Sequence, residues 1–420
     1  MAALVFVVGA LVILAVVPLL TRIPRPAAMM FVVLVSLAML PYGVYVPLLF
    51  ALVLIVALSG RRGIFPLRFL PLLIVGLVQL MFAWGDTSEQ RLGYLVLLYL
   101  VLSWWLGAYL AQLVAEDRRA ERLIALIILG IVSIETFITV LQWVGVDIFP
   151  SSVRNAEFAA ASRANGTFAH PGTLGKALIF LVVLVLPLTR SADAVTRRFS
   201  FLAMGLAVVP IGISESRTNF LAYIVLAVTW AVLLPRGRKL GARFFVPATV
   251  IVVSLAFLDS FIARFEADPE GGARGHLMEI ALAHMPENLF LGVGAKSYVT
   301  YFGQYDPLTA EGWLVHNVFV LETAELGLIG AILLFLPLLE PAVRAFRNVR
   351  RADSRADYSR STIAMLPAIV VIGFGGWGLA NGETFFLWFF VTGYLAQRVS
   401  LVQEDRSFER RPRRRLGRVL

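Results

Sequence analysis

Long, uninterrupted apolar runs constrain the fold of this chain more than any other feature. The runs lie at approximately 3–20, 27–41, 44–59, 64–84, 92–114, 123–148, 173–188, 199–213, 219–235, 245–262, 314–339, 363–379 and 384–397. Most approach the roughly 20 residues that a helix needs to cross a bilayer, and they do not alternate as transmembrane barrel strands do. We therefore predict an all-α, polytopic helical membrane protein, in which residues 1–420 form a single integral membrane domain with about 12–13 transmembrane helices.

Composition supports the same conclusion. Hydrophobic residues make up 59% of the chain and charged residues 15%, whereas a soluble domain has roughly 45–50% apolar and about 25% charged residues. The first run, 3–20, follows no basic segment, so we expect a retained span and not a cleaved signal peptide. The helix count and the side on which the N-terminus lies stay open, because Pro41, Gly43 and Pro47 interrupt the segment 27–59.

The distribution of charge predicts the orientation. The chain has 37 basic and 27 acidic residues and a net charge of +10. The basic residues gather in every second loop and in the tail, at 61–62, 118–122, 190–198, 236–243, 340–362 and 398–420. Because basic loops face the cytoplasm, we expect a basic cytoplasmic tail at 398–420, near membrane lipids, and a large extracytoplasmic loop at 264–313. The basic excess indicates this topology and not nucleic-acid binding.

Arginines on the predicted outer side go against this charge bias and need another explanation. Arg163 and His170 belong to a segment, 163–172, that is rich in turn residues and precedes a span. Arg217 follows Ser216 at the start of another span, where the free N–H groups of a helix also attract anions. Together these groups would form a phosphate-sized anion site. The alternative is an arginine that reaches toward lipid head groups or pairs with Glu215.

The large outer loop contains a predicted helix and a tight turn. Apolar residues and a histidine recur at helical spacing, at Leu277, Ile280, Ala281 and His284. This spacing predicts a short amphipathic helix that begins at Arg274, lies on the outer membrane face and ends before Pro286. The sequence Gly292-Val-Gly294 then predicts a turn, and it lacks the surrounding strand and helix of a nucleotide-binding motif.

A histidine at the mouth of the next span is a candidate general base. His316 and Asn317 stand where the 314–339 run begins, and an imidazole accepts a proton near neutral pH. A histidine bound to a backbone carbonyl at the interface is the alternative. Further along, Gly327 and Gly330 would let neighbouring helices approach closely.

Metal and cofactor chemistry have little support in the sequence. The chain has no cysteine, and its four histidines (His170, His276, His284 and His316) have no recognised ligand spacing. Nucleotide-binding and nucleophile-elbow motifs are also missing. A group transfer would therefore need no metal and no cofactor, and would use an already activated donor on the outer side.

These features together resemble the O-antigen ligase and O-antigen polymerase superfamily of bacterial membrane glycosyltransferases. The resemblance covers roughly residues 150–335. It rests on the segment 163–171, on Ser216-Arg217, on Arg274 with the helix and turn that follow, and on His316-Asn317 before Gly327 and Gly330. The segment 163–171 departs from the family pattern, because Gly172 replaces an asparagine that often follows the proline.

The resemblance implies an inverting, metal-independent transfer of a glycan from a polyprenyl-diphosphate donor to an acceptor hydroxyl, on the outer face of the bacterial inner or plasma membrane. By this similarity Arg217, Arg274 and His316 are the catalytic residues: the arginines would bind the diphosphate, and His316 would deprotonate or orient the acceptor. The residues expected to bind substrate are Arg163, His170, Ser216 and Asn317. Bidentate arginines suit phosphate oxygens, which makes these assignments chemically reasonable.

Several alternatives stay open at the level of the sequence. The acceptor would be lipid A core, a growing polysaccharide or a protein hydroxyl, and the motifs do not separate these. A flippase or transporter of lipid-linked glycans would also need polar groups among its helices, and Glu322 and Glu325 favour it. A purely structural role in envelope assembly would instead leave Arg217 and His316 free to vary.

Overall fold

The structure is a computed structural model in which residues 25–39, 52–53, 67–81, 87–146, 163–235, 272–350, 356–380 and 382–409 are described, with isolated positions between 255 and 266. Within these residues all regular secondary structure is helical. The predicted spans 3–20, 44–59 and 245–262 lie wholly or largely outside the described residues, as does the end of the basic tail. The total number of transmembrane helices therefore stays a prediction.

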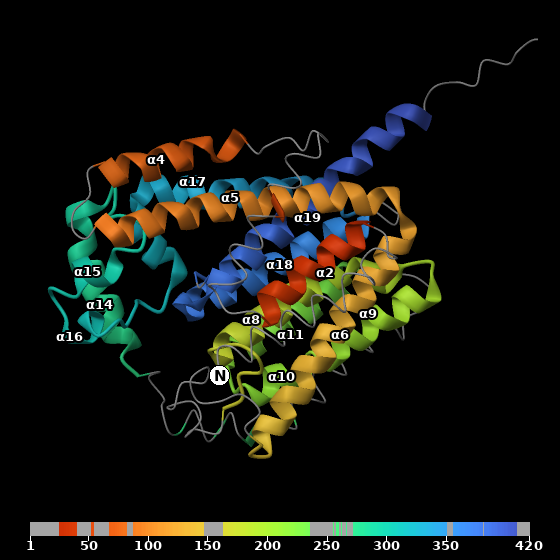
Figure 1. The fold of residues 1–420 in the computed structure, drawn as a ribbon, viewed down its shortest axis with the longest axis horizontal. Coiled ribbons are helices and arrows are strands. Elements are labelled where there is room, and N and C mark those ends of the chain that lie inside the picture. The colour runs from red at the N-terminus through yellow and green to blue at the C-terminus, as the bar shows by residue number, and fades with distance from the viewer. Residues whose placement is uncertain are drawn as a thin grey trace, which may run out of the picture.

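Six helical segments in the described residues are long and apolar enough to cross a membrane. They lie in α5 (Thr87–Glu116), α6 (Arg118–Trp143), α8 (Pro171–Val185) with the 3-10 helix η2 (Pro187–Arg190), α9 (Ala194–Leu206) with α10 (Val208–Ile213), α17 (Val318–Asn348) and α18 (Ala356–Gly375). The bundle also includes α2 (Arg25–Met39), α4 (Leu70–Met81), α11 (Arg217–Leu233) and α19 (Gly382–Glu409) (Figure 1). Large apolar side chains such as Phe137, Leu202 and Val232 are exposed on outward faces, which suits a lipid environment. The prediction of an all-α membrane protein is confirmed.

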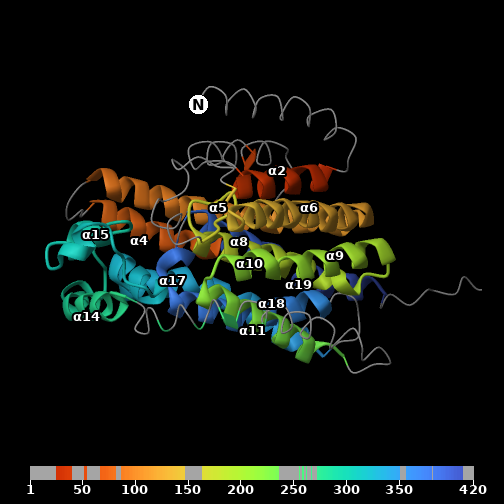
Figure 2. The same cartoon turned by 90° about the horizontal axis from the view of Figure 1, so that it is seen from below.

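Helix α8 lies at the centre of the bundle. Every residue from Pro171 to Val185 is buried, as expected for a helix that is apolar on all sides. Helices α6, α9, α11, α18 and α19 contact it from different directions, and Figure 2 shows it among them. Pro171 occupies the first helical turn, where its fixed φ angle suits the start of a helix. The core of the protein therefore forms around the helix that follows the predicted segment 163–172.

Glycines allow α5 and α19 to pack closely. A Cβ atom at Gly107 would collide with the backbone of Phe390, and one at Gly393 would collide with the backbone of Trp104. The two helices therefore meet backbone to backbone, which is a common mode of packing in membranes.

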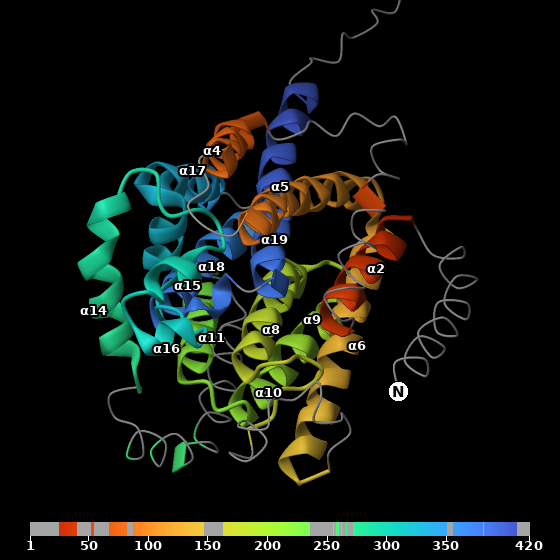
Figure 3. The same cartoon turned by 60° about the vertical axis from the view of Figure 1, so that its left-hand side comes forward.

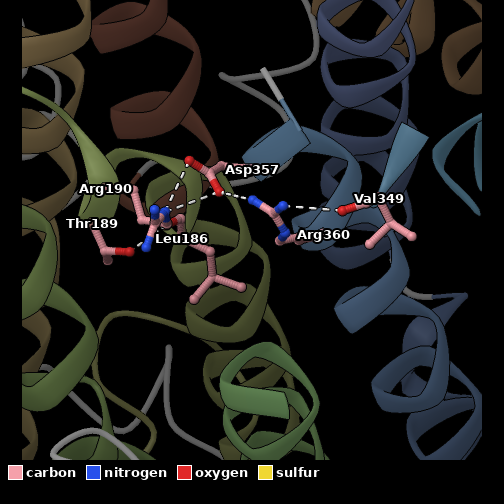
Figure 4. A network of polar contacts seen from close by, with 6 residues as sticks. All are labelled: Leu186, Thr189, Arg190, Val349, Asp357 and Arg360. Atoms are coloured by element: carbon pink, nitrogen blue, oxygen red, sulfur yellow. Dashed lines mark hydrogen bonds and ion pairs between the residues drawn. The ribbon is translucent and has the colours of Figure 1, made fainter. Parts of the chain in front are cut away.

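A polar network joins three helices at the end of the bundle where α8 and α17 finish and α18 begins (Figure 4). Arg190, the last residue of the 3-10 helix that follows α8, places its Nε atom 3.1 Å from the Asp357 carboxylate. Arg360 pairs with the same carboxylate, and its Nη2 atom donates to Val349 O at 3.0 Å. Two arginines thus share one buried aspartate, in the loops that the charge distribution predicts to be cytoplasmic. We call this the arginine end of the bundle.

Residues 272–317 form a lobe at the end of the bundle that lies opposite to the arginine end (Figures 2 and 3). We call this end of the bundle the lobe end. The lobe contains α14 (Arg274–His284), the short 3-10 helix η3 (Met285–Asn288), α15 (Tyr298–Phe302) and α16 (Pro307–Ala310). The structure thus contains the predicted helix that begins at Arg274. His276 Nε2 lies 2.8 Å from Asp306 Oδ1 and ties α14 to the start of α16.

The lobe is inserted into a break in α17. Gly327 has φ 71° and ψ 171°, which is not helical, and interrupts the backbone hydrogen bonds around it. The lobe supplies partners for the freed groups, as a break within a membrane helix requires. The four hydrogen bonds run from Val293 N to Ala324 O (3.0 Å), from Gly294 N to Glu325 O (2.8 Å), from Leu328 N to Leu289 O (2.7 Å) and from Ile329 N to Phe290 O (3.4 Å).

Two glycines of the sequence motifs make this junction possible. A Cβ atom at Gly292 would collide with the backbone nitrogen of Gly327, and one at Gly327 would collide with the carbonyl oxygen of Phe290. The close approach expected at Gly327 is therefore made by the lobe backbone and not by a neighbouring helix. The Glu325 carboxylate accepts from Lys296 N at 2.8 Å, which gives this buried acid a structural role in the junction.

Candidate active site

The segment 163–170 turns back into the bundle and is held there by α6. Gln142 Oε1 accepts hydrogen bonds from the backbone nitrogens of Asn165 (3.0 Å) and Gly166 (2.9 Å). Two turns deeper in α6, Glu135 accepts from the backbone nitrogen (3.0 Å) and the hydroxyl (2.5 Å) of Thr167. These buried side chains satisfy the backbone of a loop that would otherwise be unstable in an apolar environment.

The first turn of α8 gathers polar groups from two helices. His170 is the N-cap, and its Nδ1 atom accepts from Gly172 N at 2.8 Å. The carbonyl oxygen of Gly172 accepts from Lys176 Nζ at 3.1 Å and from Asn219 Nδ2 at 2.9 Å. The capping bond orients the His170 ring, whose predicted role in substrate binding stays a prediction.

The start of α11 brings two of the predicted arginines to one turn. Arg163 is buried and its Nε atom donates to Ser214 O at 3.3 Å. Ser216 occupies the N-cap position, and Arg217 is the first residue of α11. The next residue, Thr218, donates from its hydroxyl to Gly375 O at the end of α18, at 3.4 Å.

The start of α17 positions His316. Asn317 is the N-cap, and its Oδ1 atom accepts from the backbone nitrogens of Phe319 (2.9 Å) and Val320 (3.3 Å). This cap fixes the backbone directly after His316. The Phe319 ring packs against the last turn of α18, where a Cβ atom at Gly373 would lie 2.6 Å from it. The same turn of α18 contacts Thr218, so Arg217 and His316 lie at one end of the bundle.

Arg274, Lys176 and His316 interact electrostatically although they come from the lobe, from α8 and from the start of α17. The positive charge of Arg274 acts on both Lys176 and His316. His316 is half-buried, and no described residue forms a hydrogen bond with its buried Nδ1 atom. Burial, Arg274 and Lys176, in that order of effect, lower the pKa of His316 to about 4. The imidazole is therefore neutral at neutral pH and available to accept a proton.

Comparison with known protein families identifies the region that carries these groups. Residues 199–335 match the family model described as O-antigen ligase. This segment is similar to the O-antigen ligase family. It contains Arg217, Arg274 and His316, and it covers the larger part of the resemblance that the motifs indicate. A comparison with curated proteins finds no match.

The segment that matches the family model does not include all the polar groups of the lobe end. Lys176 and the segment 163–172 precede it, and both contact or interact with residues inside it. In the described part of the chain, no group of three or more histidine, cysteine or acidic side chains is arranged to hold a metal ion.

Sequence reasoning missed the buried polar residues that support the site, namely Glu135, Gln142, Lys176 and Asn219. Lys176 had a usable signal, because it is one of only three lysines and lies inside the apolar run 173–188. A charge inside a membrane-spanning run is a functional candidate by default.

Proposed function

We propose that this protein transfers a glycan from a polyprenyl-diphosphate donor to an acceptor hydroxyl, and that the reaction takes place at the lobe end of the bundle. The observation that carries the proposal is the meeting of a neutral imidazole, His316, with the positive charges of Arg274 and Lys176. A transfer of this kind needs a proton acceptor beside a site for a polyanion. The match of residues 199–335 to the O-antigen ligase family model supports the same reaction class.

The proposed reaction is a displacement at the anomeric carbon of the donor sugar. The acceptor oxygen forms a bond to this carbon as the bond to the diphosphate oxygen breaks, and the leaving diphosphate keeps the electron pair. His316 accepts the hydroxyl proton. Arg217 and Arg274 bind the diphosphate and stabilise the negative charge that grows on it, an interaction that strengthens in the transition state. Attack from the side opposite to the leaving group inverts the configuration.

The distribution of charge supports an outer location for this reaction. The arginine end carries the loops that the positive-inside rule assigns to the cytoplasm, so the lobe and its site face the exterior. The C-terminal tail, which follows α19, then lies in the cytoplasm. The membrane is the inner or plasma membrane of a bacterium, where polyprenyl-linked glycans are presented to such an enzyme.

Purified protein in liposomes tests the function directly. We expect transfer of a labelled glycan from a polyprenyl diphosphate to an added acceptor, with release of the polyprenyl diphosphate. Lipid A core, a second polyprenyl-linked chain and a protein substrate are supplied in parallel to identify the acceptor class. Movement of the donor across the bilayer without transfer would instead identify a flippase, and the absence of both activities would indicate a structural protein.

The pH dependence of transfer provides a second prediction. His316 must be neutral to accept a proton, and its pKa in the free protein is about 4. We therefore expect kcat/KM, which reports the free enzyme, to fall only below about pH 4 to 5. A bound diphosphate opposes the positive charges that lower this pKa, so the acid limb of kcat should lie at higher pH. An acid limb of kcat/KM near pH 6.5 would contradict the lowered pKa of His316, and an acid limb that is unchanged in His316→Gln would contradict its assignment as the base.

A further inference from the structure

Lys176 is a buried cation within a membrane-spanning helix. Lys176 is only 6% exposed, and its ammonium group donates to Gly172 O at 3.1 Å. A Cβ atom at Gly378 would lie 3.0 Å from Nζ, and one at Gly172 would lie 3.3 Å from it. Because both residues are glycines, neither places a side chain against the ammonium group.

The surroundings of Lys176 add positive charge instead of balancing it. Within the part of the chain that the structure describes, no carboxylate forms an ion pair with Lys176, while Arg274 acts on it as a like charge. The arginine end of the bundle provides a contrast, because Arg190 and Arg360 there share the Asp357 carboxylate (Figure 4). A buried cation without a counter-ion costs several kcal/mol. An anion that binds from outside the chain would supply the missing counter-ion and offset this cost.

Unsatisfied polar atoms beside Lys176 also indicate a ligand. Asn219 is fully buried and binds the same carbonyl oxygen as Lys176, yet its Oδ1 atom has no hydrogen-bond partner among the described residues. The buried Nδ1 atom of His316 also has no hydrogen-bond partner among the described residues. Buried polar atoms are usually paired. One of these two atoms belongs to a side chain that shares a carbonyl partner with Lys176, and the other to a side chain on which the charge of Lys176 acts, so together they favour a site that a ligand fills.

We propose that Lys176 is a third cationic residue of the donor site and binds the diphosphate together with Arg274, next to His316. This inference rests on the function proposed above, because it identifies the anion as the donor diphosphate. The compact ammonium group stabilises the leaving diphosphate as a point charge, while the arginines bind its oxygens in fixed geometry. Departure of the diphosphate adds negative charge, so the contribution of Lys176 grows during the reaction.

The variant Lys176→Met tests the inference, since methionine has a similar shape without the charge. The full-length protein in detergent is titrated with farnesyl diphosphate, a soluble probe with the same headgroup. We expect Lys176→Met to weaken binding of this probe at least tenfold and to raise the melting temperature, because a costly buried charge is removed. Lys176→Arg keeps the charge and should retain more of the affinity than Lys176→Met.

In Lys176→Met the acid limb of kcat/KM should also move to higher pH, because one positive charge near His316 is lost.

Lys296→Met is the matched control. Lys296 belongs to the lobe, and its charge acts on Glu322, so its loss should change the affinity for farnesyl diphosphate less than twofold. If Lys176→Met binds the probe as tightly as the wild-type protein, or melts at a lower temperature with unchanged affinity, Lys176 is structural and the inference is wrong. Arg274→Ala separates this outcome from failure of the proposed function. If Arg274→Ala loses the probe and Lys176→Met does not, only the role of Lys176 is overturned. If both variants bind the probe as tightly as the wild-type protein, and the wild-type protein transfers no glycan, the proposed function is overturned as well.

Discussion

Alanine in place of His316 is expected to reduce the rate of glycan transfer by about 10²–10⁴-fold, the range for the loss of a general base. This loss is expected because His316 directly precedes the N-cap of α17 and the positive charges of Arg274 and Lys176 act on it, which is where the proposed reaction needs a proton acceptor. The measurement is the initial rate of transfer in proteoliposomes with saturating donor. We expect the loss mainly in kcat, since the imidazole acts on the acceptor proton and contributes little to donor binding.

A second histidine of the lobe supplies the control for this experiment. His284 stacks on Tyr305 with ring centroids 3.7 Å apart, so His284→Ala also removes an imidazole from the lobe. We expect this variant to transfer glycan within about threefold of the wild-type rate, as is usual for a substitution outside the reacting groups. If His316→Ala keeps more than about a tenth of the wild-type rate, His316 does not act as the base.

Valine in place of Gly327 is expected to destabilise the protein by about 3 kcal/mol or more. Gly327 has φ 71°, which a β-branched residue adopts only under strain, and its Cβ atom would collide with the carbonyl oxygen of Phe290. The substitution would disturb the hydrogen bonds that join the lobe to α17. Thermal unfolding in detergent measures the effect, and transfer should fall in the same variant because Arg274 belongs to the displaced lobe.

Gly130→Val provides the comparison within another membrane helix. Gly130 lies in α6, where a new Cβ atom would meet no heavy atom within 4 Å. The melting temperature of this variant should stay close to that of the wild-type protein. Equal melting temperatures for Gly327→Val and Gly130→Val would mean that the break in α17 and its contacts with the lobe do not contribute to stability.

Local patterns in the sequence predicted the features that depend on local physics. The apolar runs predicted the membrane helices, and the spacing after Arg274 predicted α14 with its first residue. The junction between Gly292 and Gly327 was not predicted, because its hydrogen bonds join backbone groups that no side-chain pattern identifies.

The buried supports of the site were missed for a related reason. Glu135 and Lys176 each lie in an apolar run and far from the next charged residue of the chain, and average hydropathy conceals such an isolated charge. Their partners, Thr167 and Gly172, come from the fold of the segment 163–172. Sequence reasoning therefore proposed the arginines and His316 as site residues but did not single out the buried polar residues around them.

The break in α17 has a mechanical consequence. Because the lobe replaces the missing hydrogen bonds of that helix on both sides of Gly327, the lobe and the outer turns of α17 are expected to tilt or shift as one rigid body. The guanidinium of Arg274 and the imidazole of His316 then keep their mutual spacing when the surrounding bilayer becomes thinner or thicker. The geometry of the proposed site would thus be insulated from the lipid composition of the membrane around it.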